Sequence, residues 1–317
     1  MSTRDTETAV AEHHECPVIH GRRAIQRIQP RLSDVGGMPV ARVLPRPERR
    51  LIGAWCFLDH AGPARFERNA AGMRVGPHPH IGLQTFTWMI EGEVLHRDSL
   101  GTEQVIRPGQ VNLMTAGRGI SHTEESVPGT TALQLVQLWI ALPYEDRQTA
   151  PRFDHYPTLP QFEQDGVRLT LLIGDYAGHR APTLTFSPLV GVDLTWSDAV
   201  DAEFQLDPAF EWGMLPLEGP VEIDGNRFEQ DELAYLGTGR SSLPLRATGA
   251  GRAMLIGGEP FTDKVTLWWN FVGHGKAEIE RAQADWEAHS ERFGEVQGFD
   301  GPRLSPPPIP WARGIPD

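Results

Sequence analysis

The regular spacing of glycine and proline limits the fold of this chain more than any other feature. The sequence holds 33 glycines and 27 prolines in 317 residues. These residues separate short runs rich in β-forming residues, such as TFTWMI (85–90), LQLVQLWIAL (133–142) and VRLTLLI (167–173). Turn residues at intervals of about ten predict an all-β fold of the antiparallel sandwich or barrel type, and not alternating βαβ units.

A polar, proline-containing stretch divides this β-rich sequence near its middle, with strand-forming runs on both sides. We therefore predict a first β domain over residues 21–148, a linker over 149–166 and a second β domain over 167–260. Residues 1–20 are polar and predict a flexible N-terminus. Residues 261–317 predict a C-terminal helix and a tail.

The helix is predicted over residues 276–294. Apolar residues recur there at near-helical spacing, namely Ile279, Ala282, Trp286 and Phe293. Gly294 follows as a stop residue. The sequence after it is rich in proline, which excludes a helix.

Charge, hydropathy and cysteine content exclude several classes of function. The 29 basic and 42 acidic residues give a net charge of −13, which repels phosphate backbones and argues against direct nucleic-acid binding. No run approaches the roughly 20 apolar residues of a membrane helix. We interpret Cys16 as a thiol in a loose N-terminus and Cys56 as a buried thiol, without a disulfide. A cytoplasmic location is predicted.

Two pairs of potential metal ligands occur in the first half. His78 and His80 lie two residues apart before a strand-forming run, and His122 and Glu124 have the same spacing. On a strand, residues i and i+2 point to the same face. If both pairs lie on neighbouring strands, three imidazoles and one carboxylate converge. That set suits Fe(II), Mn(II), Ni(II), Cu(II) or Zn(II) and leaves open coordination positions.

The second half has no comparable pair. Residues 90–117 and 217–239 are weakly similar, as each has a hydrophobe-Glu-Gly opening, a short hairpin, a strand and a glycine-containing corner. The corner of the second half, residues 236–247, contains neither histidine nor acid. If the halves are duplicates, only the first binds metal.

The sequences HPHIGLQTFTWMIEGEVLHRDSLG and PGQVNLMTAGRGISHTE resemble the signature of the pirin family within the cupin superfamily. The resemblance extends over roughly residues 25–294. It implies a bicupin, two β-barrels in one chain, with one metal in the N-terminal barrel. The ligands implied by the motif are His78, His80, His122 and Glu124. The implied cofactor is one divalent metal, Fe(II) in the first place, with Mn, Ni, Cu or Zn as alternatives.

The resemblance implies more than one function. The first is a metal-dependent dioxygenase of the quercetin 2,3-dioxygenase type, with a small aromatic substrate and Glu124 as ligand and catalytic base. Phe86, Trp88, Leu113 and Met114 are candidates for lining its barrel mouth, or are ordinary core. The second is a non-enzymatic iron-binding regulator with a protein partner, a transcription factor or a metabolic enzyme. The third is a stable bicupin with a vestigial site.

Three positions depart from the usual family motif. Ile81 stands where pirins usually have arginine, and Gln84 where they usually have glutamate. Gln110 replaces a more usual aspartate. The paired loss of charge at the first two positions predicts a lost ion pair or altered surroundings of the metal, which can tune its affinity and reactivity.

Overall fold

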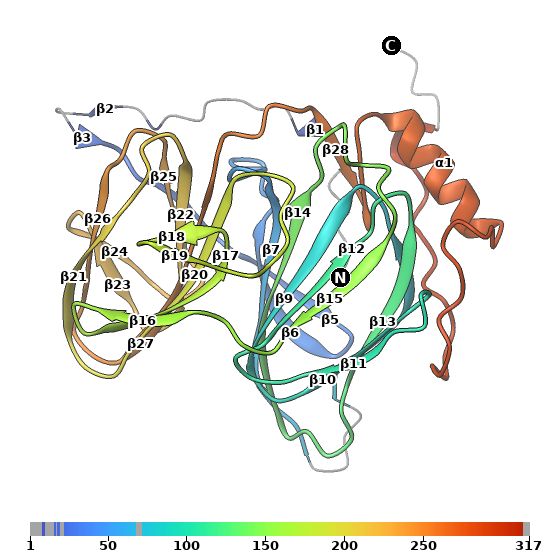
Figure 1. Ribbon diagram of the computed structural model, residues 1–317, viewed down its shortest axis with the longest axis horizontal. Coiled ribbons are helices and arrows are strands. Elements are labelled where there is room, and N and C mark those ends of the chain that lie inside the picture. The colour runs from blue at the N-terminus through green and yellow to red at the C-terminus, as the bar shows by residue number, and fades with distance from the viewer. Residues whose placement is uncertain (1–7, 10–15, 17, 20–21, 68–71, 313–317) are drawn as a thin grey trace.

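The computed structural model of the protein describes residues 8–9, 16, 18–19, 22–67 and 72–312. Two β-rich halves lie side by side, and helix α1 (Lys276–Glu287) lies on the outer side of the first half (Figure 1). The predicted all-β bicupin fold with one C-terminal helix is confirmed. Most of the segment 1–20, predicted to be flexible, lies outside the described residues.

The first half consists of a seven-stranded and a four-stranded sheet. The large sheet contains, in spatial order, β15 (Arg152–Tyr156), β12 (Val111–Thr115), β9 (Leu83–Glu91), β14 (Ala132–Ala141), β7 (Trp55–Arg65), β6 (Met38–Leu44) and β5 (Arg31–Val35). The small sheet contains β11 (Glu103–Ile106), β10 (Val94–Asp98), β13 (Ile120–Ser126) and β8 (Arg74–His80). All of these neighbours pair antiparallel.

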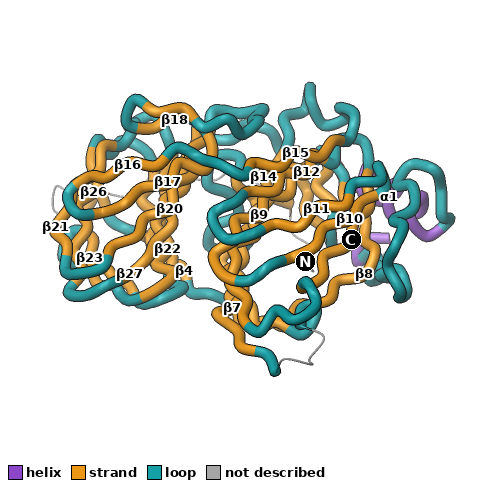
Figure 2. The backbone as a smooth tube through the Cα atoms, turned by 60° about the horizontal axis from the view of Figure 1, so that its bottom comes forward, coloured by secondary structure: helices purple, strands orange, loops and turns teal. Residues whose placement is uncertain are grey.

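The second half repeats this arrangement of two sheets. Its strands lie beside those of the first half in the tube of Figure 2. Its large sheet contains β16 (Gln161–Gln164), β17 (Val167–Ile173), β20 (Leu189–Trp196), β27 (Gly251–Gly258), β22 (Glu211–Glu218), β25 (Leu233–Gly237) and β4 (Gln26–Ile28). Its small sheet contains β21 (Val200–Gln205), β26 (Ser242–Ala247), β23 (Val221–Ile223) and β24 (Asn226–Phe228).

Short elements complete the described fold. They are β1 (Thr8–Ala9), β28 (Val265–Trp268) and β29 (Phe271–Gly273) in one sheet, β2 (Val18–Ile19) with β3 (Arg22–Arg23), β18 (Asp175–Tyr176) with β19 (His179–Arg180), and a 3-10 turn at Pro310–Ala312.

The large sheet of each half has an edge strand that lies outside the residues predicted for that domain. Strand β4 lies within residues 21–148, which were predicted as the first domain, yet it pairs with β25 of the second half. The predicted linker, 149–166, contains β15, which pairs in the first large sheet, and β16, which pairs in the second. The connection between these two strands is therefore limited to residues 157–160.

The two large sheets pack against each other through one hydrophobic core. Trp55 of the first half donates a hydrogen bond from Nε1 to the carbonyl oxygen of Gly257 in the second, at 3.1 Å. The core that surrounds it includes Leu138 from the first half and Leu215 and Ile256 from the second. The large sheets are therefore covered on both faces, which explains why β14 is buried along nearly its whole length.

Helix α1 packs on the end of the first barrel, but it is shorter than predicted. It ends at Glu287 instead of residue 294, because His289 adopts a φ of 54° that a right-handed helix does not allow. Phe293 is nevertheless buried in a cluster with Ile81, Phe271 and Trp286. No helix in the described part of the chain is long and apolar enough to cross a membrane. The cytoplasmic location stays a prediction.

Both cysteines are buried, and neither forms a disulfide. This confirms the expected thiol at Cys56, where burial raises the pKa well above its usual value. The interpretation of Cys16 as part of a loose terminus is wrong. Its Sγ lies 3.7 Å from the carbonyl oxygen of Tyr235, and only 5% of the residue is exposed.

Candidate metal centre

The two sequence pairs lie on neighbouring antiparallel strands. His78 on β8 is directly opposite His122 on β13, so the condition for convergence is met. Strand β8 is the edge of the small sheet and has β13 as its one neighbour there. Pro77 and Pro79 have no backbone N–H to donate, and an edge strand tolerates them because it pairs on one side only. The loop before β13 depends on Gly117, whose φ is +50°. A Cβ added to this residue would lie 2.0 Å from the carbonyl oxygen of Thr149.

Three of the four predicted ligands converge. The side-chain nitrogens of His78, His80 and His122 that could bind an ion lie within 4.8 Å of one another, and all three residues are buried. The Nε2 atoms of His80 and His122 are 3.1 Å apart. Glu124 is also buried but is not part of this group of described residues. A shift of strand register between His122 and Glu124 places Glu124 opposite Val75.

Backbone carbonyls orient two of the imidazoles. The Nδ1 of His78 is 2.8 Å from the carbonyl oxygen of Gly76, and the Nδ1 of His80 is 2.8 Å from that of Asn270. Because a carbonyl only accepts, each Nδ1 carries the proton and each Nε2 of a neutral ring has a lone pair. Burial lowers the pKa of His80 to about 3 and holds those of His78 and His122 well below the usual value, so the rings are neutral.

The Nε2 of His78 is buried and has no hydrogen-bond partner among the described residues. A buried polar atom without a partner costs free energy unless something binds it. A divalent cation at the point where these nitrogens converge would satisfy it, and neutral imidazole is a common ligand for such ions. The three histidines therefore fit a metal ion.

A fourth buried histidine adjoins the cluster and was missed by the sequence analysis. The Nδ1 of His96 on β10 is 3.3 Å from the Nδ1 of His122, and its Nε2 is 3.1 Å from Oδ2 of Asp98. Although burial raises the pKa of Asp98, its hydrogen bonds with His96 and Thr102 outweigh this, and the pKa is lowered. His96 and Asp98 have the same i, i+2 spacing that identified the two ligand pairs, so the signal was present in the sequence.

The large sheet presents two rows of side chains on the face toward the histidines. In antiparallel strands, directly opposed residues point to the same face. The nearer row consists of Phe57, Trp139, Thr85, Met114 and Phe153. Trp139 lies 5.2 Å from His80 and Phe153 lies 4.4 Å from His96, between ring centroids. The farther row is polar and consists of Arg42, Asp59, Gln137, Thr87 and Asn112.

Of the predicted lining residues, only Met114 lies on this face. Leu113 is opposite Phe86 and shares the other face with it. The ring of Phe86 contacts Trp55, which bonds to the second half, and the ring of Trp88 lies 6.0 Å from the guanidinium of Arg252. Phe86, Trp88 and Leu113 therefore form core between the two barrels.

The departures from the family motif have defined environments. Ile81 is buried against Phe271, in the cluster that holds helix α1. Gln84 is fully buried, and its Nε2 donates to Oγ1 of Thr115 at 3.0 Å. Gln110 accepts a hydrogen bond from the backbone N–H of Arg107 in a turn. At position 81, where the usual motif has a charged arginine, this chain therefore has a buried apolar side chain.

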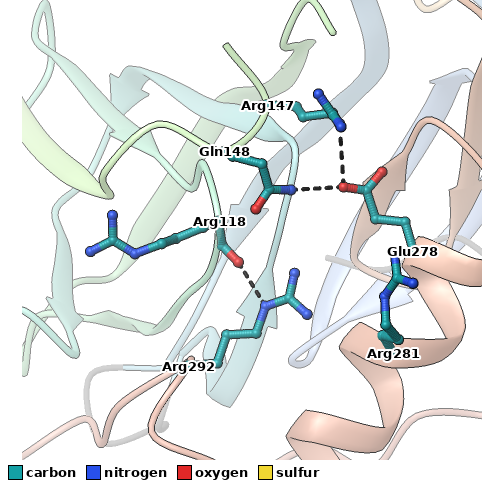
Figure 3. Close-up of a pocket in the computed structure, with 6 residues that line it drawn as sticks. All are labelled: Arg118, Arg147, Gln148, Glu278, Arg281 and Arg292. Carbon is teal, nitrogen blue, oxygen red and sulfur yellow. Dashed lines mark hydrogen bonds and ion pairs between the residues drawn. The ribbon is translucent and has the colours of Figure 1, made fainter. Parts of the chain in front are cut away.

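A cleft of about 440 Å³ lies between the loop before β13, residues 147–148 and helix α1 (Figure 3). Within it, Glu278 accepts a hydrogen bond from Gln148 at 2.8 Å and pairs with Arg147 at 3.6 Å. Arg292 donates to the carbonyl oxygen of Arg118 at 2.7 Å. No histidine lines the cleft. We interpret the polar contacts within it as an anchor for helix α1.

The fold and the histidine cluster together define a bicupin with a candidate metal centre in its first barrel. The chain belongs to the pirin family: the model described as Pirin matches residues 37–140, and that described as Pirin C-terminal cupin domain matches residues 191–294.

Among its relatives is a provisionally named quercetin 2,3-dioxygenase of Pseudomonas aeruginosa, 55% identical over 98% of both chains. A pirin-like protein of Caulobacter vibrioides is 37% identical and covers 81% of this chain and 91% of its own. The crystal structure of a quercetin 2,3-dioxygenase from Acinetobacter baumannii matches with a TM-score of 0.88 and 46% identity, over 90% of this chain and 96% of that one.

Proposed function

We propose that this protein is a metal-dependent dioxygenase that acts on a flavonol-type aromatic substrate, with Fe(II) bound by His78, His80, His122 and Glu124. The observation that carries this proposal is the set of three neutral, buried imidazoles whose ligand atoms converge. One of these atoms, Nε2 of His78, has no hydrogen-bond partner among the residues that the structure describes. The names of the relatives from Pseudomonas and Acinetobacter support the reaction type.

The four side chains suit the proposed metal, because imidazole and carboxylate are both ligands of non-haem iron and leave positions open. When bound, the metal would supply a Lewis acid that favours loss of the proton from the substrate hydroxyl. Glu124 is two residues from His122 on the same face of β13 and is buried. As a carboxylate it serves as the fourth ligand and accepts the substrate proton on an oxygen.

The two rows of the large sheet match the chemistry of a flavonol. Phe57, Trp139 and Phe153 offer apolar ring surface next to the histidines, suited to a planar aromatic body. In the polar row beyond them, Thr87 donates to Oε1 of Gln137 at 2.8 Å and Oδ1 of Asn112 lies 2.7 Å from Nδ1 of His155. Substrate hydroxyl groups would bind the donors and acceptors that these contacts leave over. Burial of Thr87, Gln137 and Asn112 excludes bulk water.

Oxygen uptake in a sealed cell tests this proposal. Fe(II)-loaded protein is expected to consume O2 only when quercetin is present, and His122→Ala is expected to abolish the uptake. Uptake that needs iron and flavonol together establishes the dioxygenase. If protein shown to hold iron consumes no O2 with quercetin, the regulator with a protein partner becomes the better interpretation, and a partner search follows.

A further inference from the structure

We infer that His96 and Asp98 are positioning residues that set the proton of His122 on Nδ1, so that its Nε2 presents a lone pair to the metal. Neither residue belongs to the predicted ligand set. The inference rests on the metal site of the proposed function and concerns how the chain prepares that site.

The proton positions follow from what each atom can donate. A carboxylate oxygen only accepts, so Nε2 of His96, 3.1 Å from Oδ2 of Asp98, carries a proton. An Nε2 of His122 that binds the metal would need its lone pair, which puts the proton of His122 on Nδ1. That proton faces Nδ1 of His96 at 3.3 Å, which accepts it when His96 holds its own proton on Nε2 alone. The Nε2 atoms of His80 and His122, 3.1 Å apart, then both direct lone pairs to the metal.

Both positioning residues are held in place. Oδ1 of Asp98 accepts from the backbone N–H of Leu100 at 2.9 Å and of Thr102 at 3.1 Å, which turns Oδ2 toward His96. The His96 ring stacks on Phe153 with centroids 4.4 Å apart, and only 4% of the residue is exposed. The carboxylate and the ring therefore keep their relative orientation.

The position of His122 in the sheet explains why it needs side-chain partners. His78 and His80 donate directly to backbone carbonyls. Strand β13 lies between β10 and β8, so its backbone is used for pairing on both sides. His122 instead obtains an acceptor from the side chain of His96 on β10. Such outer partners fix the tautomer of a ligand and its metal affinity.

Asp98→Asn tests the inference with the loss of a single charge. The two backbone N–H groups keep the amide oxygen in the Oδ1 position, so the amide nitrogen faces His96 and donates to it. His96 then carries its proton on Nδ1, and His122 is driven to hold its proton on Nε2. Zn(II) affinity, measured by competition with a chelator, is expected to fall about 10- to 100-fold.

The control is Asp207→Asn, because Oδ1 of Asp207 likewise accepts a backbone N–H, that of Ala209, in an exposed turn of the second half. Its Zn(II) affinity is expected to equal that of the wild type. His96→Asn places a carbonyl oxygen near the Nδ1 position and is expected to bind Zn(II) more tightly than His96→Leu, which has no acceptor. Equal affinities of these two variants would contradict the inference.

Nitrogen-15 NMR of the histidine side chains in Zn(II)-loaded protein gives a second readout. In the wild type, His96 is expected to be protonated on Nε2 and His122 on Nδ1, whereas in Asp98→Asn His96 is expected to be protonated on Nδ1. A Zn(II)-loaded wild type with the proton of His96 on Nδ1 would overturn the inference.

The two hypotheses fail in different ways. Wild type that binds no Zn(II) contradicts the proposed metal site itself. Wild type and Asp98→Asn that bind Zn(II) within twofold of each other contradict only the role of His96 and Asp98.

Discussion

The two barrels have the same strand order but different interiors. Strands β8, β13, β10 and β11 of the first small sheet correspond in order to β21, β26, β23 and β24 of the second. Where the first barrel turns histidines inward from β8 and β13, the second has apolar residues, among them Ala202 and Phe204 on β21 and Leu243 and Leu245 on β26.

The large sheets differ in the same way. The row Arg42, Asp59, Gln137, Thr87 and Asn112 of the first barrel corresponds to Leu171, Val192, Leu255, Met214 and Ala234 of the second. All of the latter belong to one apolar core. The cupin scaffold thus folds around an apolar interior, and the first barrel keeps buried polar groups that such a fold does not need. Groups of this kind cost stability, which points to function.

The largest expected effect is the loss of bound metal when a histidine of the first barrel is replaced by an apolar residue, as in the interior of the second barrel. His80→Ala and His122→Ala each remove one converging imidazole, so both are expected to lose bound metal, as measured by elemental analysis of purified protein. His179→Ala changes an exposed histidine of the second half that stacks on Phe162 and is expected to retain it. Full metal occupancy in both site variants would show that the site is assigned wrongly.

The convergence of the three histidines could be predicted from the sequence because the spacing within each candidate pair depends on short-range geometry. His78 and His80 share a face of any strand, as do His122 and Glu124. The repeated turn signals likewise suffice for an all-β fold. His96 has the same spacing to Asp98, but its meaning depends on β10 lying beside β13, a long-range pairing that spacing does not encode.

The direction in which each strand faces could not be predicted. Strand β9 is buried on both faces, so alternation of Thr85 and Thr87 with Phe86 and Trp88 does not reveal which set points into the barrel. In the structure Thr85 and Thr87 point into the first barrel, and Phe86 and Trp88 pack toward the second barrel. Only the packing of one large sheet on the other determines this.

The next effect concerns the buried ion pair of the polar row. Arg42 and Asp59 form a bidentate pair with N–O distances of 2.8 Å, and both side chains are at most 4% exposed. Asp59→Asn removes the carboxylate charge of Asp59 from the buried guanidinium and is expected to lower the free energy of unfolding by about 3–5 kcal/mol. Urea denaturation measures this.

Replacing the whole pair separates its charge from its packing. Arg42→Met combined with Asp59→Leu makes this part of the row apolar, as in the second barrel, and is expected to be neutral or stabilising. Asp201→Asn, which breaks the pair with Arg246 in the second half, is expected to leave the free energy of unfolding nearly unchanged, because both side chains are exposed to solvent. If Asp59→Asn lowers the free energy of unfolding no more than Asp201→Asn does, the buried polar row does not reduce the stability of the first barrel.

The smallest effect, over the tested range of pH 7 to 5, is a pH dependence that arises from the buried histidines of the first barrel. Burial lowers the pKa of His80 in the folded protein to about 3, below the value near 6.5 expected when unfolded. The unfolded chain therefore binds a proton first as the pH falls, and the stability conferred by the neutral ring is present above pH 6.5 and lost below it. For His80 the loss is about 1.4 kcal/mol per pH unit between these two values.

His80→Leu removes this contribution and places an apolar side chain where the second barrel has one. Urea unfolding of metal-free protein at pH 7, 6 and 5 is expected to show a shallower loss of stability in His80→Leu than in the wild type. His179→Ala is expected to follow the wild type, because that ring is exposed. Parallel curves for all three proteins would mean that the His80 ring is hydrated or already protonated when folded, and the contrast between a neutral buried cluster and an apolar interior would be lost.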